Sequence, residues 1–367
     1  MRVALVHYWL VGMAGGEKVL EALCRIYPEA DIFTHVLNRE AISPTIARHT
    51  VRTTFINALP RSRTSYKRYL PLMPLALERL DLTGYDLVIS SESGPAKGVV
   101  TRADSLHICY CHTPMRYLWD HWAEYHANAG MLSRMGMRLF LPALRRWDVA
   151  SAFRVDRFVA NSRTVARRIR KHWRRHAGVV YPPVCIDDFS CRERPGGEFY
   201  LCLGRLVPYK RIDLAVQVCS LTNRPLVVAG AGEQMDALRG QAAPCVRFLG
   251  RQDDAQVRRL LKECRALIFP GEEDFGIVPV EAAASGAPVL AYKRGGATET
   301  VREGVTGLFF QEQTADALEA ALLEFERCEQ NFDPRQLRHH AAMFGEDRFR
   351  REFLRQVDIA REEQERC

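Results

Sequence analysis

Two cations follow one apolar run in the second half of the chain. Arg205 and Lys210 stand five positions apart in the segment GRLVPYKRID, directly after the run YLCL. A guanidinium presents a planar fork of donors and an ammonium acts as a point charge, so the pair suits a diphosphate that departs as a leaving group. A solvated basic turn without a ligand is the alternative interpretation.

Two carboxylates in the segment FPGEEDFGIVPVEAAASG are spaced for a polyhydroxylated ligand. Glu273 and Glu281 are eight positions apart, and we expect a helix after Pro279 that has Glu281 in its first turn. Carboxylates accept hydrogen bonds from vicinal hydroxyls, and the first N–H groups of a helix attract phosphate. The backbone N–H groups expected to meet a phosphate are those of Phe275, Gly276 and Ile277. Two capping acids on a surface helix are the alternative.

Glycines precede a helical segment near the N-terminus. Gly12, Gly15 and Gly16 lie between the run VALVH and the segment KVLEALCRIY, which has helical periodicity. Glycine lets a backbone approach a ligand, and the start of a helix attracts an anion. The order is not G-x-G-x-x-G, and no acidic residue occupies a clear ribose position, so a dinucleotide site is only weakly supported. A phosphate loop and a plain turn both stay open.

A histidine and several aromatic residues follow the apolar run HICYC. His112 would stand at the carboxyl end of that strand, where it could bind a sugar hydroxyl or move a proton. A histidine that only packs is the alternative. The aromatic segment after it would either contact an acceptor sugar or form an edge of the core, and it contains Arg116, Tyr117, Trp119, Asp120 and Trp122.

These residues need a scaffold, and short apolar runs that alternate with amphipathic stretches predict parallel sheets with helices on both faces. The segment VVYPPVCIDDFSCRERPGGEF separates two such α/β units near residue 185. Ligands of parallel sheets bind at the carboxyl ends of strands, so we expect the site in a cleft between the units. The predicted strands are Val3–His7, Asp31–Val36, Leu87–Ser90, His107–Cys111, Arg157–Ala160, Tyr200–Gly204, Leu226–Ala229, Val246–Leu249, Ala266–Phe269 and Pro288–Ala291.

Composition and charge restrict the class of protein. The chain has 367 residues, 47% of them hydrophobic, which predicts two domains. It has neither an uninterrupted apolar stretch of about 18 residues nor a secretory signal, so we expect a cytoplasmic protein without a membrane-spanning helix. The net charge of +8 is uneven: residues 1–190 carry +11 and residues 191–367 carry −3. The basic half could face anionic lipid, nucleic acid or an anionic substrate, or it could have no particular partner. No nucleic-acid-binding motif is present, so we expect no nucleic-acid partner.

The cysteines do not predict a metal site. Of the eleven, only Cys109 and Cys111 stand close together, and no second pair completes a set of ligands. We expect reduced and mostly buried thiols, and no bound metal.

In combination these motifs resemble the retaining nucleotide-sugar glycosyltransferases of family 4, whose GT-B fold has two Rossmann-like domains that face each other across a cleft. The resemblance covers nearly the whole chain. It implies an acceptor-binding domain over residues 1–185, a nucleotide-sugar-binding domain over 186–345, and a helix over 346–367 that packs back on the first domain. The motifs that carry it are Gly15-Gly16, His112, Asn161-Ser162, Arg205 with Lys210, and Glu273-x-Phe275-Gly276-x4-Glu281.

The resemblance also assigns roles to these residues. Arg205 and Lys210 would hold the donor diphosphate, Glu273 the donor sugar and Glu281 the ribose. The amides of Phe275 to Ile277 would support sugar and phosphate, Gly15 and Gly16 would close over the phosphates, and His112 would approach the transferred sugar. The implied transfer needs no metal and no cofactor besides the donor, because the cations take the place of Mg²⁺. No carboxylate is clearly placed as a nucleophile, which favours a front-face, oxocarbenium-like route with retention.

A weaker likeness concerns the substrates. The segment CHTPMRYLWD is similar to bacterial mannosyltransferases of O-antigen and exopolysaccharide assembly. It favours GDP-mannose as the donor and a glycan or polyprenyl-diphosphate-linked saccharide as the acceptor, with a UDP-sugar donor or a nucleotide-sugar epimerase as alternatives. The family's usual G-G-x-P-E has Thr298 in place of proline here, so the turn from Gly295 to Glu299 is given no role.

Two basic segments predict peripheral contact with an anionic membrane on its cytoplasmic face. Residues 61–80 combine five cations with tyrosines, leucines and a methionine, and the run RTVARRIRKHWRR over 163–175 adds more cations and a tryptophan. Clustered cations beside interfacial aromatic residues attract anionic bilayers. Solvated helix faces over an ordinary core are the alternative.

Overall fold

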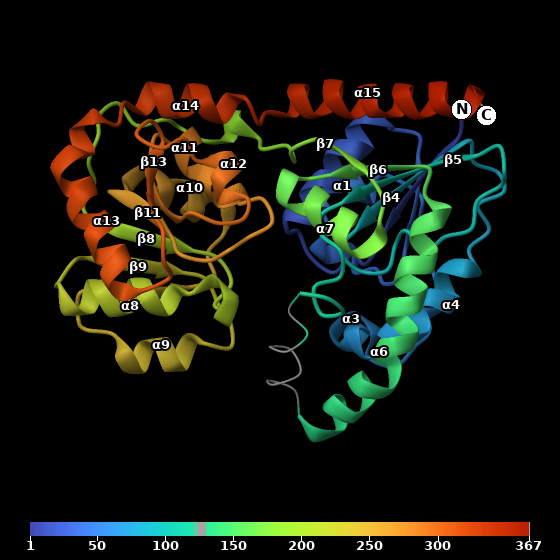
Figure 1. The fold of residues 1–367 in the computed structure, drawn as a ribbon, viewed down its shortest axis with the longest axis horizontal. Helices are drawn as coiled ribbons and strands as arrows, with labels where there is room; N and C mark the ends of the chain where they lie inside the picture. The colour runs from blue at the N-terminus through green and yellow to red at the C-terminus, as the bar shows by residue number, and fades with distance from the viewer. Residues whose placement is uncertain (121, 123–129, 367) are drawn as a thin grey trace. The chain divides into compact units, whose positions relative to one another are not determined.

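The computed structural model of the protein describes residues 1–120, 122 and 130–366. It divides into two compact units. The first contains residues 1–183 and 349–367, and the second contains residues 184–348 (Figure 1). Each unit is built on its own parallel sheet.

The first unit has a seven-stranded parallel sheet. Its central strand β1 is buried along its whole length, as expected for a parallel strand covered on both faces. In spatial order the strands are β3 (Val51–Thr53), β2 (Asp31–Thr34), β1 (Val3–His7), β4 (Leu87–Glu92), β5 (Leu106–Cys111), β6 (Arg157–Ala160) and β7 (Ala177–Val179). The helices are α1 (Gly15–Ile26), α2 (Pro44–Ala47), α3 (Ser62–Ser65), α4 (Met73–Glu78), α6 (Met131–Ser151), α7 (Arg163–Trp173) and α15 (Glu346–Glu365).

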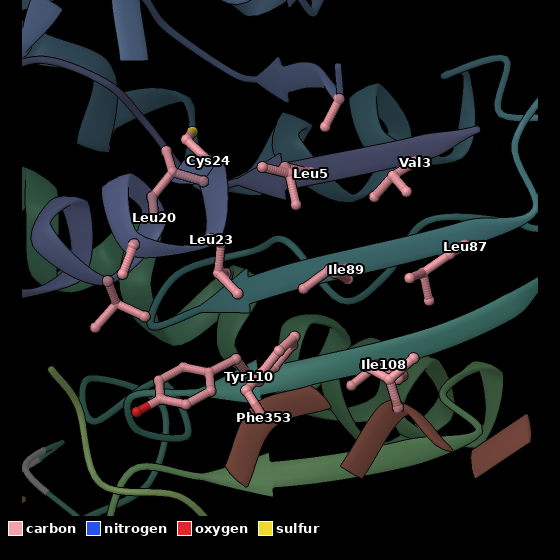
Figure 2. Close-up of a cluster of buried hydrophobic side chains, with 14 of the residues drawn as sticks. Val3, Leu5, Leu20, Leu23, Cys24, Leu87, Ile89, Ile108, Tyr110 and Phe353 are labelled. Carbon is pink, nitrogen blue, oxygen red and sulfur yellow. The ribbon is translucent and has the colours of Figure 1, made fainter. Parts of the chain in front are cut away.

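One face of this sheet is covered by both the first and the last helix of the chain. Figure 2 shows Leu5, Ile89 and Ile108 of neighbouring strands in one apolar cluster with side chains of α1 and with Phe353 of α15. Phe349 and Phe353 stack with their ring centroids 5.8 Å apart, and Tyr110 of β5 lies against both rings. The C-terminal helix is therefore part of the core of the N-terminal unit.

The second unit has a six-stranded parallel sheet. In spatial order its strands are β10 (Val246–Gly250), β9 (Leu226–Ala229), β8 (Tyr200–Leu203), β11 (Ala266–Phe269), β12 (Val289–Tyr292) and β13 (Gly307–Phe310). The helices are α8 (Ile212–Leu221), α9 (Met235–Gln241), α10 (Asp254–Glu263), α11 (Ile277–Ala284), α12 (Ala297–Thr300), α13 (Ala315–Cys328) and α14 (Pro334–Ala342).

Both sheets reverse their winding direction next to their first strand. In the first unit β1 lies between β2 and β4, and in the second β8 lies between β9 and β11. Loops on either side of such a switch point diverge, and ligands of doubly wound sheets bind there. The predicted two-unit α/β architecture is confirmed, and every predicted strand is present with ends shifted by at most two residues.

No helix within the described part of the chain is both long enough and apolar enough to cross a bilayer.

Candidate functional site

In the second unit, the two loops at the switch point meet through an ion pair. Strands β8 and β11 are neighbours, so the loops that follow them leave the same edge of the sheet. Lys210 ends a short 3₁₀ helix, Pro208–Lys210, in the first loop, and its Nζ lies 2.7 Å from Oε1 of Glu273 in the second. The pair sets a cation beside a carboxylate that can accept hydrogen bonds from hydroxyls.

Glycines make this approach sterically feasible. A Cβ on Gly204, whose φ is +137°, would lie 2.7 Å from Nζ of Lys210. A Cβ on Gly271 would lie 2.7 Å from Cα of the same lysine. Any side chain at either position would displace Lys210 from Glu273.

Arg205 lies beside this pair in sequence but takes no part in it. It follows Gly204, its side chain is exposed, and it has no carboxylate partner among the residues that the structure describes. An exposed guanidinium without a carboxylate can bind an incoming anion without first breaking an ion pair.

The acidic segment differs from its prediction at one point. Helix α11 begins at Ile277, two residues before Pro279, so Glu281 lies in the second turn rather than the first. Proline is tolerated in a first turn because those N–H groups have no partner within the helix, and so it does not mark the start. The side chain of Glu281 is only 7% exposed.

The start of α11 is suited to an anion through its backbone. Gly276 precedes the helix with φ +86°, and no side chain caps this end. The ring of Phe275 is buried and contacts that of Phe344 at a centroid distance of 5.7 Å, so this ring belongs to the core. The N–H groups at the start of α11, with that of Ile277 first, are the groups that a phosphate would meet.

The turn at Gly295 and Gly296, which was given no role, supports the acidic loop. The N–H of Gly296 donates to the carbonyl of Glu273 at 2.8 Å. A Cβ on Gly295 would lie 2.4 Å from that carbonyl oxygen, and one on Gly296 would lie 2.2 Å from Cα of Phe275. The two glycines thus hold the backbone that carries Glu273, and Thr298 in place of proline leaves this contact intact.

In the first unit, the glycine loop follows β1 at the switch point, and His112 follows β5 at the same edge of the parallel sheet. Helix α1 begins at Gly15, and a Cβ on Gly16 would lie 2.1 Å from the hydroxyl of Tyr8. Gly16 therefore has a packing reason for being glycine in addition to the predicted phosphate contact. His112 directly follows β5, and its ring lies edge-on to that of Tyr8, with 6.4 Å between the ring centroids.

His112 is held by residues that the sequence did not single out. Its Nε2 lies 2.9 Å from Oγ of Ser91, and that oxygen lies 3.0 Å from Nδ1 of His7. Burial, with the nearby His7, lowers the pKa of His112 to about 3. The ring is therefore neutral at physiological pH. One signal in the sequence could have found this group: the predicted strands Val3–His7 and Leu87–Ser90 both end in polar residues.

The aromatic segment after His112 forms a core edge around a buried charge network. The indole N–H of Trp119 donates to Oδ2 of Asp148 in α6 at 2.8 Å, and its ring stacks on that of His172 in α7. Asp148 also accepts from Trp173 at 2.7 Å and pairs with Lys97 at 2.5 Å. Of the two alternatives for Trp119, the structure therefore favours the core edge over an acceptor contact.

Lys97 joins two carboxylates in this network. Its Nζ lies 3.5 Å from Oε1 of Glu92, and all three charged side chains are fully buried. Burial alone would lower the pKa of Lys97, but the carboxylates of Asp148 and Glu92 outweigh that effect and raise it. Burial raises the pKa of Glu92 to about 7 despite the opposing lysine.

The thiols of Cys109 and Cys111 lie in a buried apolar cluster with Phe158 and Trp173. Burial raises the pKa of the Cys109 thiol well above its ordinary value. Both cysteines act as small core residues.

The structure thus gathers the predicted site residues into two groups. Arg205, Lys210, Glu273 and the start of α11 occupy the switch point of the second unit. Gly15 and Gly16 occupy that of the first, and His112 lies at the same sheet edge after β5.

Comparison with known families gives this arrangement its context. Residues 13–188 match the model of Glycosyltransferase Family 4, and residues 186–345 match that of Glycosyl transferases group 1. The chain belongs to glycosyltransferase family 4. Solved structures share its GT-B fold: HepE from Anabaena in complex with UDP and glucose superposes with a TM-score of 0.72 at 18% identity, covering 97% of this chain and 99% of that one. The lipopolysaccharide outer core galactosyltransferase WaaB gives a TM-score of 0.68 at 16% identity, covering 97% and 99%.

Curated relatives match this glycosyltransferase over part of their length. The D-rhamnosyltransferase WbpZ of Pseudomonas aeruginosa is 30% identical over 203 residues, which are 50% of this chain and 52% of the relative. A D-inositol 3-phosphate glycosyltransferase of Nocardiopsis dassonvillei is 30% identical over 200 residues, or 46% and 47%. The chain spans about half the length of the curated relatives it matches.

Proposed function

We propose that this glycosyltransferase moves a hexose, with retention at the anomeric carbon, from a nucleotide-sugar to a saccharide or polyprenyl-diphosphate-linked saccharide of a surface polysaccharide. The observation that carries the proposal is the contact between Lys210 and Glu273 at the switch point, with Arg205 exposed beside it. The cations stabilise the charge that grows on the departing diphosphate, which is the role that Mg²⁺ has in other transferases. Glu273 accepts hydrogen bonds from hydroxyls of the sugar that separates from the diphosphate.

Mannose from GDP-mannose is the proposed donor, and a UDP-sugar is the second candidate. The segment from Cys111 to Asp120 supports the first through its likeness to mannosyltransferases. The second is supported by HepE, whose solved complexes hold UDP and UDP-glucose. With either donor, the nucleotide base would be recognised by residues other than those proposed to bind the diphosphate and the sugar.

A thermal-shift panel of GDP, UDP, ADP and their sugars tests the donor. A ligand that binds only the folded protein raises Tm, by an amount that grows with its concentration above Kd. We expect GDP and GDP-mannose to raise Tm more than the other pairs. Selective stabilisation by UDP and a UDP-sugar would replace the donor, and stabilisation by none of the nucleotides would contradict the transferase proposal itself.

The two carboxylates are expected to differ in kinetic effect. Glu281→Gln should raise the KM for the donor and change kcat less, because a ribose contact holds the ground state and the transition state alike. Glu273→Gln should lower kcat as well, since it touches the reacting sugar and also loses its ion pair with Lys210. Initial rates over a range of donor concentrations separate the two effects. Identical kinetics in both variants would contradict this division of roles.

We also propose that the first unit docks on anionic membrane, through a surface that differs in part from the predicted one. Residues 61–80 fit the prediction in part, because Arg61, Arg63, Lys67 and Arg68 are exposed and the exposed Leu72 and Leu75 follow them. Met73 and Leu77 of the same segment are buried in the core and do not fit it. The run over 163–175 presents exposed cations as predicted, at Arg163, Arg167, Arg170, Lys171 and Arg174. Its tryptophan does not fit, because Trp173 is fully buried in the core, and Arg175 donates to backbone carbonyls. The correction therefore concerns these two side chains and not the rest of the run.

Helix α6 supplies the apolar part instead. Met131, Met135 and Leu139 recur every fourth residue and are exposed, so they lie on one helix face, with Phe140 beside them. Leu70 of the basic segment packs against an apolar cluster that contains Leu141 and Leu144 of the same helix, so both elements border one cluster. Insertion of such side chains adds to the attraction of about 1 kcal/mol for each cation near the lipid surface.

Flotation with liposomes at low and high salt measures this docking. We expect binding to anionic vesicles that weakens with salt, and loss of it when Arg61, Arg63, Lys67 and Arg68 become Gln or when Met135 and Leu139 become Gln. Leu221→Gln is the control, because Leu221 is an equally exposed leucine of the second unit. Equal binding to neutral and anionic vesicles would contradict membrane docking and leave the transferase proposal unaffected.

A further inference from the structure

A chain of four polar side chains connects the start of α1 to His112. Oε1 of Glu17 lies 3.6 Å from Nε2 of His7, whose Nδ1 lies 3.0 Å from Oγ of Ser91. That hydroxyl lies 2.9 Å from Nε2 of His112. Glu17, His7 and Ser91 are at most 4% exposed, so the chain is shielded from water up to His112 itself.

The chain can exist in two orders, because a serine hydroxyl donates one hydrogen bond and accepts others. If Ser91 donates to Nδ1 of His7, it accepts from an N–H on Nε2 of His112. If Ser91 instead donates to Nε2 of His112, it accepts from an N–H on Nδ1 of His7. The two orders leave opposite tautomers on His112.

Glu17 selects between the two orders. Its other oxygen, Oε2, accepts the backbone N–H of Ala14 at 3.0 Å, which fixes the carboxylate at the start of α1. A buried carboxylate favours an N–H over a lone pair on the nitrogen that faces it, and that nitrogen is Nε2 of His7. Nε2 of His7 has no hydrogen-bond partner among the described residues, and the carboxylate 3.6 Å away favours an N–H there, which leaves Nδ1 as the acceptor, so Ser91 donates to His7.

We infer that Glu17, acting through His7 and Ser91, holds His112 as the tautomer that donates from Nε2 and presents Nδ1 as an acceptor. Nδ1 of His112 has no hydrogen-bond partner in the described part of the chain. This nitrogen accepts from a ligand O–H or N–H, of which a hydroxyl is the kind that a sugar offers, and an ether or ionised phosphate oxygen does not fit it. The identification of that ligand as a sugar rests on the proposed function, whereas the tautomer does not.

The tautomer is measured by long-range ¹H–¹⁵N NMR of the imidazole rings. The signals of His112 are those that disappear in His112→Gln. We expect a protonated Nε2 and an unprotonated Nδ1 on His112 in the wild-type protein, and a partial or full exchange of the two in Glu17→Gln. A protonated Nδ1 on wild-type His112, or no change in Glu17→Gln, would overturn the inference.

Kinetics test whether the chain matters for transfer. Ser91→Ala should lower kcat about tenfold, as loss of a partner that orients a functional histidine commonly does, with the Kd of the free nucleotide unchanged. Ser91→Thr keeps the hydroxyl and should restore most of the rate. Ser90→Ala is the matched control, because Ser90 is the preceding residue of β4 and makes the corresponding 2.8 Å contact with Nε2 of His107.

The outcomes are separable. If Ser91→Ala and Ser90→Ala have the same kcat and the same Tm loss, Ser91 is merely structural and the positioning role is wrong. If Ser91→Thr is folded by Tm but as slow as Ser91→Ala, the hydroxyl is not what positions His112. A wild-type protein that transfers sugar from no nucleotide-sugar would refute the proposed function, while the NMR experiment would still decide the tautomer.

Discussion

Lys210→Ala is expected to lower kcat for sugar transfer by about 10²–10³, with a smaller change in nucleotide affinity. Negative charge on the diphosphate grows as the sugar leaves, so an ammonium in contact with it stabilises the transition state more than the ground state. The variant also leaves Glu273 without its partner at 2.7 Å. Arg205→Ala should act in the same direction, because its exposed guanidinium supplies the second cation.

The controls for this prediction come from the same unit. Arg259→Ala removes a cation that is paired with Glu263 at 2.8 Å on the exposed face of α10, and it should leave kcat unchanged. Assays with EDTA should retain full activity if the two cations replace Mg²⁺. Unchanged kcat in both Lys210→Ala and Arg205→Ala would remove these residues from the reaction, and loss of activity with EDTA would contradict transfer without a metal.

Lys97→Met is expected to destabilise the first unit by about 3–5 kcal/mol, because it leaves the carboxylates of Glu92 and Asp148 buried without their cation. All five tryptophans lie within residues 1–183, so urea unfolding followed by tryptophan fluorescence reports on this unit. Lys262→Met on the exposed face of α10 should change stability by less than about 0.5 kcal/mol.

The pH dependence of this variant has a defined sign. The pKa of Glu92 in the folded protein is raised from 4.5 to about 7, so the folded state binds a proton more tightly than the unfolded chain. Stability from this group is present below its unfolded pKa and is lost as pH rises through about 7. Without Lys97 the pKa rises further, so the deficit of Lys97→Met should be larger at pH 8 than at pH 5. A deficit that does not depend on pH would contradict the charge argument.

The central strands were predictable because they are buried on both faces and read as continuous apolar runs. β3, β7 and β13 are not among the predicted strands, because each is an edge strand of only three or four residues, too few for a periodic signal. The start of α11 differs from the prediction because proline commonly marks the beginning of a helix, whereas here Pro279 lies within the first turn.

The site was predictable where its residues are neighbours in sequence. Lys210 and Glu273 were identified from two short motifs, and sheet order explains why the two loops meet. His7, Ser91 and His112 share no motif, because 84 positions separate the first two. They meet because β1 and β4 pair with His7 opposite Ser91. The register between two strands cannot be predicted from the sequence of either strand alone.

The place of α15 in the first unit bears on the order of events during synthesis. A ribosome releases residues 1–183 long before Phe349, Phe353, Val357 and Ala360, which complete their apolar cluster. One face of the first sheet therefore stays partly uncovered during synthesis of residues 184–348. These residues can fold as a unit in that interval. Because α15 is translated after the second unit, a premature stop near residue 345 would destabilise residues 1–183, which precede it by more than 160 positions.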